Sequence, residues 1–209
     1  MLKVIVLPVG QLRTNCYLLQ EKNSSLALLI DPGDDFDFIV DKITSLNLSP
    51  QAILATHGHY DHILSALELQ LAYKIPFLVA KEDVLIVKRM EKTARYFGVP
   101  NTGPPPKISR CFKKNEKIRF GNHLLKVIST PGHTPGSVCF YLEKEQILFS
   151  GDTIFARGGY GRTDLAGGDA TKMIKSIKTI LQLPEKTIIY PGHGEASTVE
   201  REKRFFRFL

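Results

Sequence analysis

The chain has 209 residues, 43% of them hydrophobic, and a formal net charge of +7. This is ample for a packed core, and no Ser/Gly linker or low-complexity tract divides it, so residues 1–209 are expected to form one domain. No apolar run is long enough to span a bilayer, and residues 1–8 are too short and too strand-like for a signal peptide.

Strand-like and helix-like apolar patterns alternate along the chain. The expected strands lie near residues 2–7, 14–20, 25–30, 51–56, 76–80, 123–129, 137–142, 146–150 and 186–190. The expected helices lie at 36–47, 61–73, 81–97 and 169–183. The last helix has an apolar stripe that includes Met173, Ile177 and Ile180, and Asp169 is a suitable N-cap. The pattern alone predicts a mixed α and β fold.

The run from Thr56 to His62 carries four potential metal ligands directly after a buried strand-like segment. His57 and His59 are two residues apart at a strand end, so both can face one ion. Asp61 and His62 lie past the turn and can face a second ion. Imidazole and carboxylate groups are accepted ligands of zinc, iron and manganese.

Three further candidate ligands repeat this arrangement of an apolar strand, a tight turn with Gly or Pro, and then a ligand. They are His133 after 124–128, Asp152 after 146–149, and His193 after 187–189. Five of the six histidines occupy such positions, and only His123 does not. A chance scatter of core and surface histidines does not explain four strand ends that each carry a ligand.

The order of these motifs resembles that of the metallo-β-lactamase superfamily over almost the whole chain. The matching segments are Asn15-Cys16-Tyr17-Leu18, Ile30-Asp31-Pro32-Gly33, T-H-x-H-x-D-H, P-G-H-T-P-G, S-G-D-T and P-G-H-G. The resemblance implies an α/β fold, a four-layer αββα sandwich with the ligands along one edge. Within the superfamily, Gly161-Arg162-Thr163-Asp164 and Tyr190-Pro191-Gly192-His193-Gly194 are similar to single-domain glyoxalase II-like (hydroxyacylglutathione hydrolase-like) proteins.

The resemblance also implies a set of seven ligands for two divalent ions. Metal one would be held by His57, His59 and His133, metal two by Asp61, His62 and His193, and Asp152 would bridge them. Zinc is the expected metal, with iron and manganese as alternatives. True β-lactamases of this fold lack a bridging carboxylate at the Asp152 position, so this residue favours the thioesterase, lactonase, nuclease and dioxygenase branches.

The implied activity is hydrolysis of a thioester by a metal-bound hydroxide, with an S-2-hydroxyacyl-glutathione or a similar acyl thiol as substrate. Asp61 would act catalytically by accepting a hydrogen bond from the hydroxide. Arg162 would bind a glutathione carboxylate and Tyr160 would line the pocket, or Arg162 would instead pair with Asp164 to fix the loop. Full-length glyoxalase II has an additional C-terminal helical domain, whereas this sequence ends sixteen residues after His193, which leaves the identity of the thiol open.

Other functions stay open. An iron-dependent persulfide dioxygenase would use two histidines and one aspartate on a single iron. Such dioxygenases typically have a shorter stretch between the first and third ligand clusters. Here that stretch holds the expected helix at 81–97 and the proline-rich loop after it, which favours the hydrolase. A lactonase or a phosphodiesterase is a second alternative. A purely structural metal site is disfavoured, because such sites are closed and four-coordinate.

The distribution of charge and cysteine predicts the setting of the protein. Basic residues are spread along the chain, which is typical of a solvated surface or of attraction for a small anionic substrate. No long basic arm or aromatic platform suggests nucleic acid as a partner. The three cysteines have no paired spacing, and Cys16 and Cys139 lie in strand-like runs. Buried thiols in a reducing, cytoplasmic setting are therefore expected.

Overall fold

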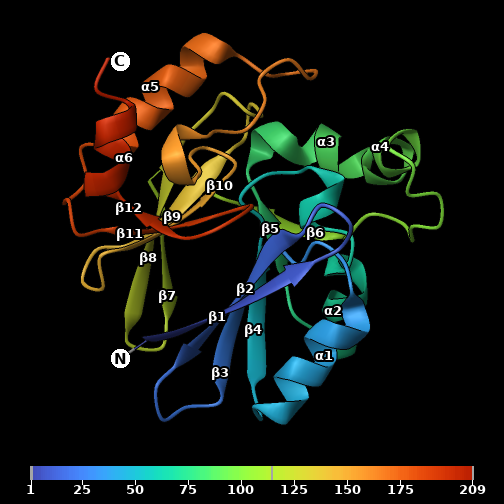
Figure 1. Ribbon diagram of the computed structural model, residues 1–209. Helices are drawn as coiled ribbons and strands as arrows, with labels where there is room; N and C mark the ends of the chain where they lie inside the picture. The colour runs from blue at the N-terminus through green and yellow to red at the C-terminus, as the bar shows by residue number, and fades with distance from the viewer. Residues whose placement is uncertain (1, 114, 209) are drawn as a thin grey trace. The chain divides into compact units, whose positions relative to one another are not determined.

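The computed structural model describes residues 2–113 and 115–208, which form two compact units, Met1–Phe112 and Lys113–Leu209. Each unit contains one six-stranded sheet with its own helices (Figure 1). Within the described residues, no helix has both the length and the apolar character required to cross a bilayer. The expectation of a single domain stays a prediction.

The sheet of the first unit follows the order of the chain. Its strands are β1 (Leu2–Val9), β2 (Thr14–Glu21), β3 (Leu26–Ile30), β4 (Ser49–Leu54), β5 (Phe77–Val79) and β6 (Ile108–Cys111). The first three strands pair antiparallel, and β3 to β6 pair parallel. The helices are α1 (Phe36–Ser45), α2 (Ala66–Tyr73), α3 (Val84–Lys88) and α4 (Met90–Tyr96).

One apolar core joins this sheet to its helices. Leu29 of β3 and Ile53 of β4 are fully buried with Ile39 of α1 and Leu69 of α2. Each such side chain stabilises the fold by roughly 1.5–3 kcal/mol relative to an exposed one. The ends of β3 and β4 are thus held firmly, and both lead into the turns that carry the candidate ligands.

The second unit has its own sheet, in which neighbouring strands again follow the order of the chain. Its strands are β7 (Lys117–Phe120), β8 (His123–Ser129), β9 (Val138–Leu142), β10 (Ile147–Gly151), β11 (Ile188–Pro191) and β12 (Ser197–Thr198). Within the described residues, β10 and β11 are the only neighbouring strands of this sheet that pair parallel, and the other neighbours pair antiparallel. Helices α5 (Ala170–Ile180) and α6 (Val199–Phe205) complete the unit.

The predicted helix stripe and cap of α5 are confirmed. Met173, Ile177 and Ile180 are buried in the core of the second unit. The side chain of Asp169 accepts a hydrogen bond from the backbone N–H of Lys172, as an N-cap does.

Two predicted helices were wrong in extent, and four short elements were not expected. Residues Tyr60–His62 form a 3₁₀ turn, so the helix predicted at 61–73 begins only at Ala66. The helix predicted at 81–97 is three pieces, a 3₁₀ turn at Lys81–Asp83 followed by α3 and α4. Asp83 (φ −98°, ψ 2°) and Arg89 (φ −97°, ψ 7°) leave helical geometry at the two breaks. Strands β6, β7 and β12 are too short to give a clear period. Helix α6 is highly charged, and only two of its residues are buried.

The cysteines differ in accessibility, as predicted. Cys16 and Cys139 are buried free thiols, whereas Cys111 is half-buried. Burial raises the pKa of the Cys16 thiol strongly, and the negative charge of Asp31 adds to this effect. Burial raises the pKa of Cys139 to about 11. Both thiols therefore lack the thiolate that reacts with alkylating reagents.

We predict that iodoacetamide at pH 8 modifies Cys111 in the native protein, and that Cys16 and Cys139 react only after unfolding in guanidinium. Mass spectrometry of the labelled peptides gives the rate for each thiol. Cys111→Ser serves as the control and should lack the fast reaction. Native labelling of Cys16 at the rate of Cys111 would contradict the prediction.

Candidate metal centre

Parallel pairing of β3 and β4 places Asp31 beside the histidine turn. Ile30 pairs with Leu54 at the ends of these strands, and the N–H of Asp31 donates to the carbonyl of Leu54 at 3.1 Å. The N–H of Thr56 then donates to Oδ1 of Asp31 at 2.7 Å. Asp31 is 1% exposed, so its carboxylate must be satisfied by such donors.

The same carboxylate determines which ring nitrogen of His57 carries a proton. The Thr56 hydroxyl donates its single hydrogen to Oδ2 of Asp31 at 2.6 Å. At its 3.0 Å contact with Nδ1 of His57, that hydroxyl must therefore accept. Nδ1 of His57 is the protonated nitrogen, and the neutral ring carries its lone pair on Nε2.

His62 is oriented by Asp31 directly. Its Nδ1 lies 3.0 Å from Oδ2 of Asp31, and a carboxylate can only accept, so Nδ1 again carries the proton. The opposite nitrogen, Nε2, lies 3.5 Å from Oδ2 of Asp61. Asp31, His57 and His62 each offer one ligand atom, and these atoms lie within 4.8 Å of one another.

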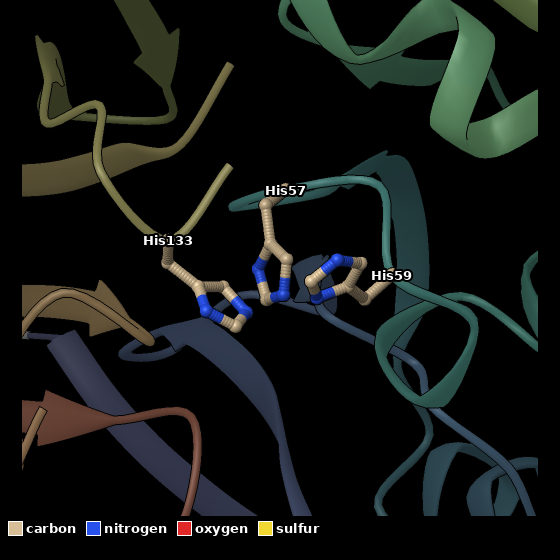
Figure 2. A group of neighbouring side chains, drawn as sticks. All are labelled: His57, His59 and His133. Carbon is tan, nitrogen blue, oxygen red and sulfur yellow. The ribbon is translucent and has the colours of Figure 1, made fainter. Parts of the chain in front are cut away.

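The rings of the histidine turn gather closely. His57 lies 4.9 Å from His59 and 4.2 Å from His62 between ring centroids. Figure 2 shows His57 and His59 leaving one loop and turning their rings toward each other, nearly at right angles. The prediction that these two side chains face the same way is confirmed.

Two features outside the turn hold its backbone. The N–H of Gly58 donates to Oδ2 of Asp83 at 2.8 Å, and Asp83 is fully buried. A Cβ at Gly33 would lie 2.0 Å from the carbonyl oxygen of Asp61, so only glycine permits this approach. Asp83 was not anticipated, since nothing local to it signals a contact 25 residues away. The role of Asp31 was also missed, although its motif had been noted.

The second unit brings Asp152 and His193 together in a similar way. β10 and β11 run parallel, and the N–H of Gly192 donates to the carbonyl of Gly151 at 2.8 Å. The residue after each partner of this hydrogen bond is a candidate ligand, Asp152 after Gly151 and His193 after Gly192. Nε2 of His193 lies 3.7 Å from Oδ2 of Asp152.

His133 reaches the same carboxylate from the turn between β8 and β9. Its Nδ1 lies 2.7 Å from the backbone carbonyl oxygen of Arg162, which can only accept, so Nδ1 carries the proton. The lone pair is on Nε2, which lies 3.4 Å from Oδ2 of Asp152. His133 is 4% exposed, and Figure 2 shows its ring projecting from its own turn.

These three distances fit the spacing of ligands on a divalent ion. Imidazole Nε2 atoms face carboxylate oxygens at 3.4, 3.5 and 3.7 Å. Charge-assisted hydrogen bonds are much shorter, about 2.7–2.9 Å. Two ligands on a tetrahedral ion, with bonds of about 2.0–2.1 Å, lie roughly 3.3 Å apart. The histidine and aspartate donors of each unit therefore suit a metal such as zinc or iron.

The predicted substrate residues lie in the loop after Asp152. Tyr160 is 50% exposed. Arg162 donates twice to Asp164, at 2.7 Å each, and this pair is solvent-exposed. The hydrogen bond from Arg162 lowers the pKa of Asp164 to about 2. The guanidinium of Arg162 thus pairs with Asp164, as the alternative in which Arg162 fixes the loop requires. Its role in substrate binding stays a prediction.

The Gly161-Arg162 motif also supports the ligands through its backbone. Besides the Arg162 carbonyl that orients His133, the N–H of Gly161 donates to the carbonyl of Asp152 at 2.9 Å. A Cβ at Gly161 would lie 2.5 Å from that carbonyl oxygen and 2.8 Å from Nδ1 of His133. The glycine is required by this close approach.

Comparison with known proteins identifies the family. Residues 9–193 match the model of the metallo-beta-lactamase superfamily. The chain belongs to this superfamily. The metallo-β-lactamase fold predicted from the motifs is confirmed by this match and by similar solved structures. One of them, TTHA1623 in a di-iron-bound form, matches with a TM-score of 0.90. That match has 34% identity and covers 99% of this chain and 100% of the other.

Two further superfamily members carry names that bear on activity. Hydroxyacylglutathione hydrolase GloC of Haemophilus influenzae is 32% identical over 212 residues, which cover 100% of this chain and 98% of that protein. The structure of BLEG-1, described as a B3 metallo-beta-lactamase, is 35% identical with a TM-score of 0.87 and covers 98% of this chain and 97% of the other. The resemblance to glyoxalase II-like hydrolases is confirmed. The chain is a member of a metallo-hydrolase superfamily with histidine and aspartate clusters for divalent metals.

We predict that Asp31→Asn weakens metal binding by about 10–100-fold, the usual cost of removing a group that orients a ligand. The asparagine amide would present N–H groups to Nδ1 of His62 and to the Thr56 hydroxyl, where an acceptor is required. Competition with a chromogenic chelator measures the affinity. Asp34→Asn, the same change at a less buried position nearby, should bind metal normally. Equal affinities in both variants would rule out this role for Asp31.

Proposed function

We propose that this protein is a metal-dependent thioesterase that acts on an S-2-hydroxyacyl-glutathione or a similar acyl thiol. The observation that carries the metal-dependent part is that imidazole Nε2 atoms face carboxylate oxygens at 3.4–3.7 Å in each unit. Likeness to the Haemophilus hydrolase over the full chain supports the thioester class.

The proposal assigns seven ligands to two metal ions. They are His57, His59 and His133 for metal one, Asp61, His62 and His193 for metal two, and Asp152 as the bridge. Zinc is proposed as the natural metal, with iron and manganese as alternatives, because imidazole and carboxylate donors accept all three. The di-iron form of TTHA1623 supports iron as a serious alternative.

The chemistry divides between the ions and the chain. When bound, the ions lower the pKa of a bound water toward about 7 and polarise the substrate carbonyl. Oδ2 of Asp61 lies 3.4 Å from the hydroxyl oxygen of Thr14, which limits its rotation. This contact supports the proposal that Asp61 accepts a hydrogen bond from the attacking water and aims it. The net charge of +7 would attract an anionic thioester.

The experiment that tests this function combines metal analysis with assays of thioester hydrolysis and oxygen uptake. The metal-replete protein should hold close to two ions per chain and hydrolyse acyl-glutathione thioesters without consuming oxygen. Asp152→Ala should lose at least about a hundredfold in turnover, or roughly 2.7 kcal/mol in the barrier.

Other outcomes would redirect the assignment. One ion per chain together with oxygen uptake on a persulfide would favour the dioxygenase. Faster turnover of a β-lactam than of any thioester would favour the activity named for BLEG-1. Preference for a lactone or a phosphodiester would favour those hydrolases instead.

Arg162 and Tyr160 are proposed as substrate-binding residues, and the role of Arg162 is tested separately. If Arg162 holds a carboxylate of the thiol half equally in ground and transition states, Arg162→Ala should raise KM and leave kcat and metal content unchanged. The rise should disappear for a thioester that lacks this carboxylate. Arg204→Ala, which removes an exposed arginine paired with Glu200, is the matched control.

The opposite result would assign Arg162 to the loop. If the parent and Arg162→Ala hydrolyse charged and uncharged thioesters with the same ratio of rates, the arginine acts only through its pair with Asp164. A smaller or differently charged thiol would then be the better substrate to test.

A further inference from the structure

The loop that follows Asp152 in the second unit is closed by backbone hydrogen bonds at its base. The carbonyl of Asp152 accepts from Gly161, and the N–H of Phe155 donates to the carbonyl of Gly159 at 2.8 Å. The tip of the loop consists of Arg157 and Gly158, both in the left-handed region (φ 63° and 76°). This conformation is unfavourable for arginine, so the tip needs support from elsewhere.

That support comes from Glu202 on helix α6. Its Oε1 accepts from the N–H of Arg157 at 3.1 Å and its Oε2 from the N–H of Gly158 at 2.8 Å. The hydroxyl of Ser197 also donates to Oε1. Glu202 is 1% exposed, and a carboxylate buried to this degree is stable only with such donors.

The tip supported by Glu202 positions residues that the proposed reaction uses. Phe155, which lies just before the tip, contacts the ring of His193 edge-on, with ring centroids 6.0 Å apart. Tyr160, just after it, lies 6.5 Å from the ring of Phe206. A second tie joins the tip to the segment after His193, since the guanidinium of Arg157 pairs with Glu195 at 2.8 Å.

We propose that Glu202 is a positioning residue. It holds the Arg157–Gly158 tip through two backbone N–H groups and thereby sets the substrate-facing side of the 155–160 segment. Asp152 is held independently at the base of the loop by β10 and by Gly161. Glu202 should therefore affect how substrate binds more than how metal binds. The kinetic part of this inference rests on the proposed hydrolase function, whereas its structural part does not.

The test compares Glu202→Gln with Glu200→Gln by hydrogen exchange and by kinetics. Glutamine keeps the size of the side chain, but its NH₂ group would oppose one of the two backbone N–H donors. Glu200 lies on the same helix, is exposed and pairs with Arg204, so it controls for the lost charge. In Glu202→Gln, exchange of the Arg157 and Gly158 amides should rise by at least about tenfold, with strand β9 unchanged.

The kinetic expectation is specific to a positioning role. KM of Glu202→Gln for the thioester should rise by about tenfold, with a smaller fall in kcat and with unchanged metal content. Glu200→Gln should match the parent in all three. A general loss of stability would instead reduce metal content and speed exchange throughout the second unit.

Two results would overturn the proposal. In the parent protein, the amides of Arg157 and Gly158 must be protected, and exchange as fast as in an open loop would show that Glu202 does not hold them. This measurement needs no variant, so it decides the matter even if Glu202→Gln fails to fold. Faster exchange with unchanged KM would reduce Glu202 to a structural brace. If the parent protein hydrolyses no thioester, the proposed thioesterase function is wrong. The exchange measurement then still tests whether Glu202 holds the amides of Arg157 and Gly158.

Discussion

A buried carboxylate is stable only when donors occupy its lone pairs, and this constraint at Asp31 organises the whole histidine turn. The backbone and hydroxyl of Thr56 and the ring of His62 supply the donors. The Thr56 hydroxyl gives its single hydrogen to Asp31, so it accepts from Nδ1 of His57. The carboxylate of Asp31 can only accept, so Nδ1 of His62 also carries the proton. The Nε2 lone pairs of both histidines are thereby prepared for a cation before any ion binds, which lowers the reorganisation required on binding.

The second unit reaches the same result with a different acceptor. A backbone carbonyl, that of Arg162, takes the place of the Asp31 carboxylate and fixes the proton of His133 on Nδ1. In both units a ligand-bearing turn follows a parallel strand pair, β3 with β4 and β10 with β11. Parallel pairing brings two strand ends to one edge of a sheet, so the residues just past those ends become neighbours.

The loops around the ligands are held from outside by buried acids. Asp83 binds the backbone of Gly58, and Glu202 binds that of Arg157 and Gly158. Such backbone contacts leave the loop side chains to face the ligands and the substrate. The Gly161-Arg162 motif, which first suggested substrate recognition, also acts through its backbone, because its N–H and carbonyl groups bind Asp152 and His133.

The sequence by itself determined the family, the fold and the candidate ligands, because each ligand sits in a local pattern of strand, tight turn and polar residue. Burial of Cys16 and Cys139 and the cap at Asp169 are also local properties, and these were predicted correctly. The break at Arg89 and the short strands were not, since a few residues do not establish a period. Only the tertiary structure decided the proton positions on the histidines, the contact of Asp83 with the backbone of Gly58, and the contacts of Glu202 with the backbone of Arg157 and Gly158. Each of these depends on which strands and helices lie side by side, and no pattern within a single segment carries that information.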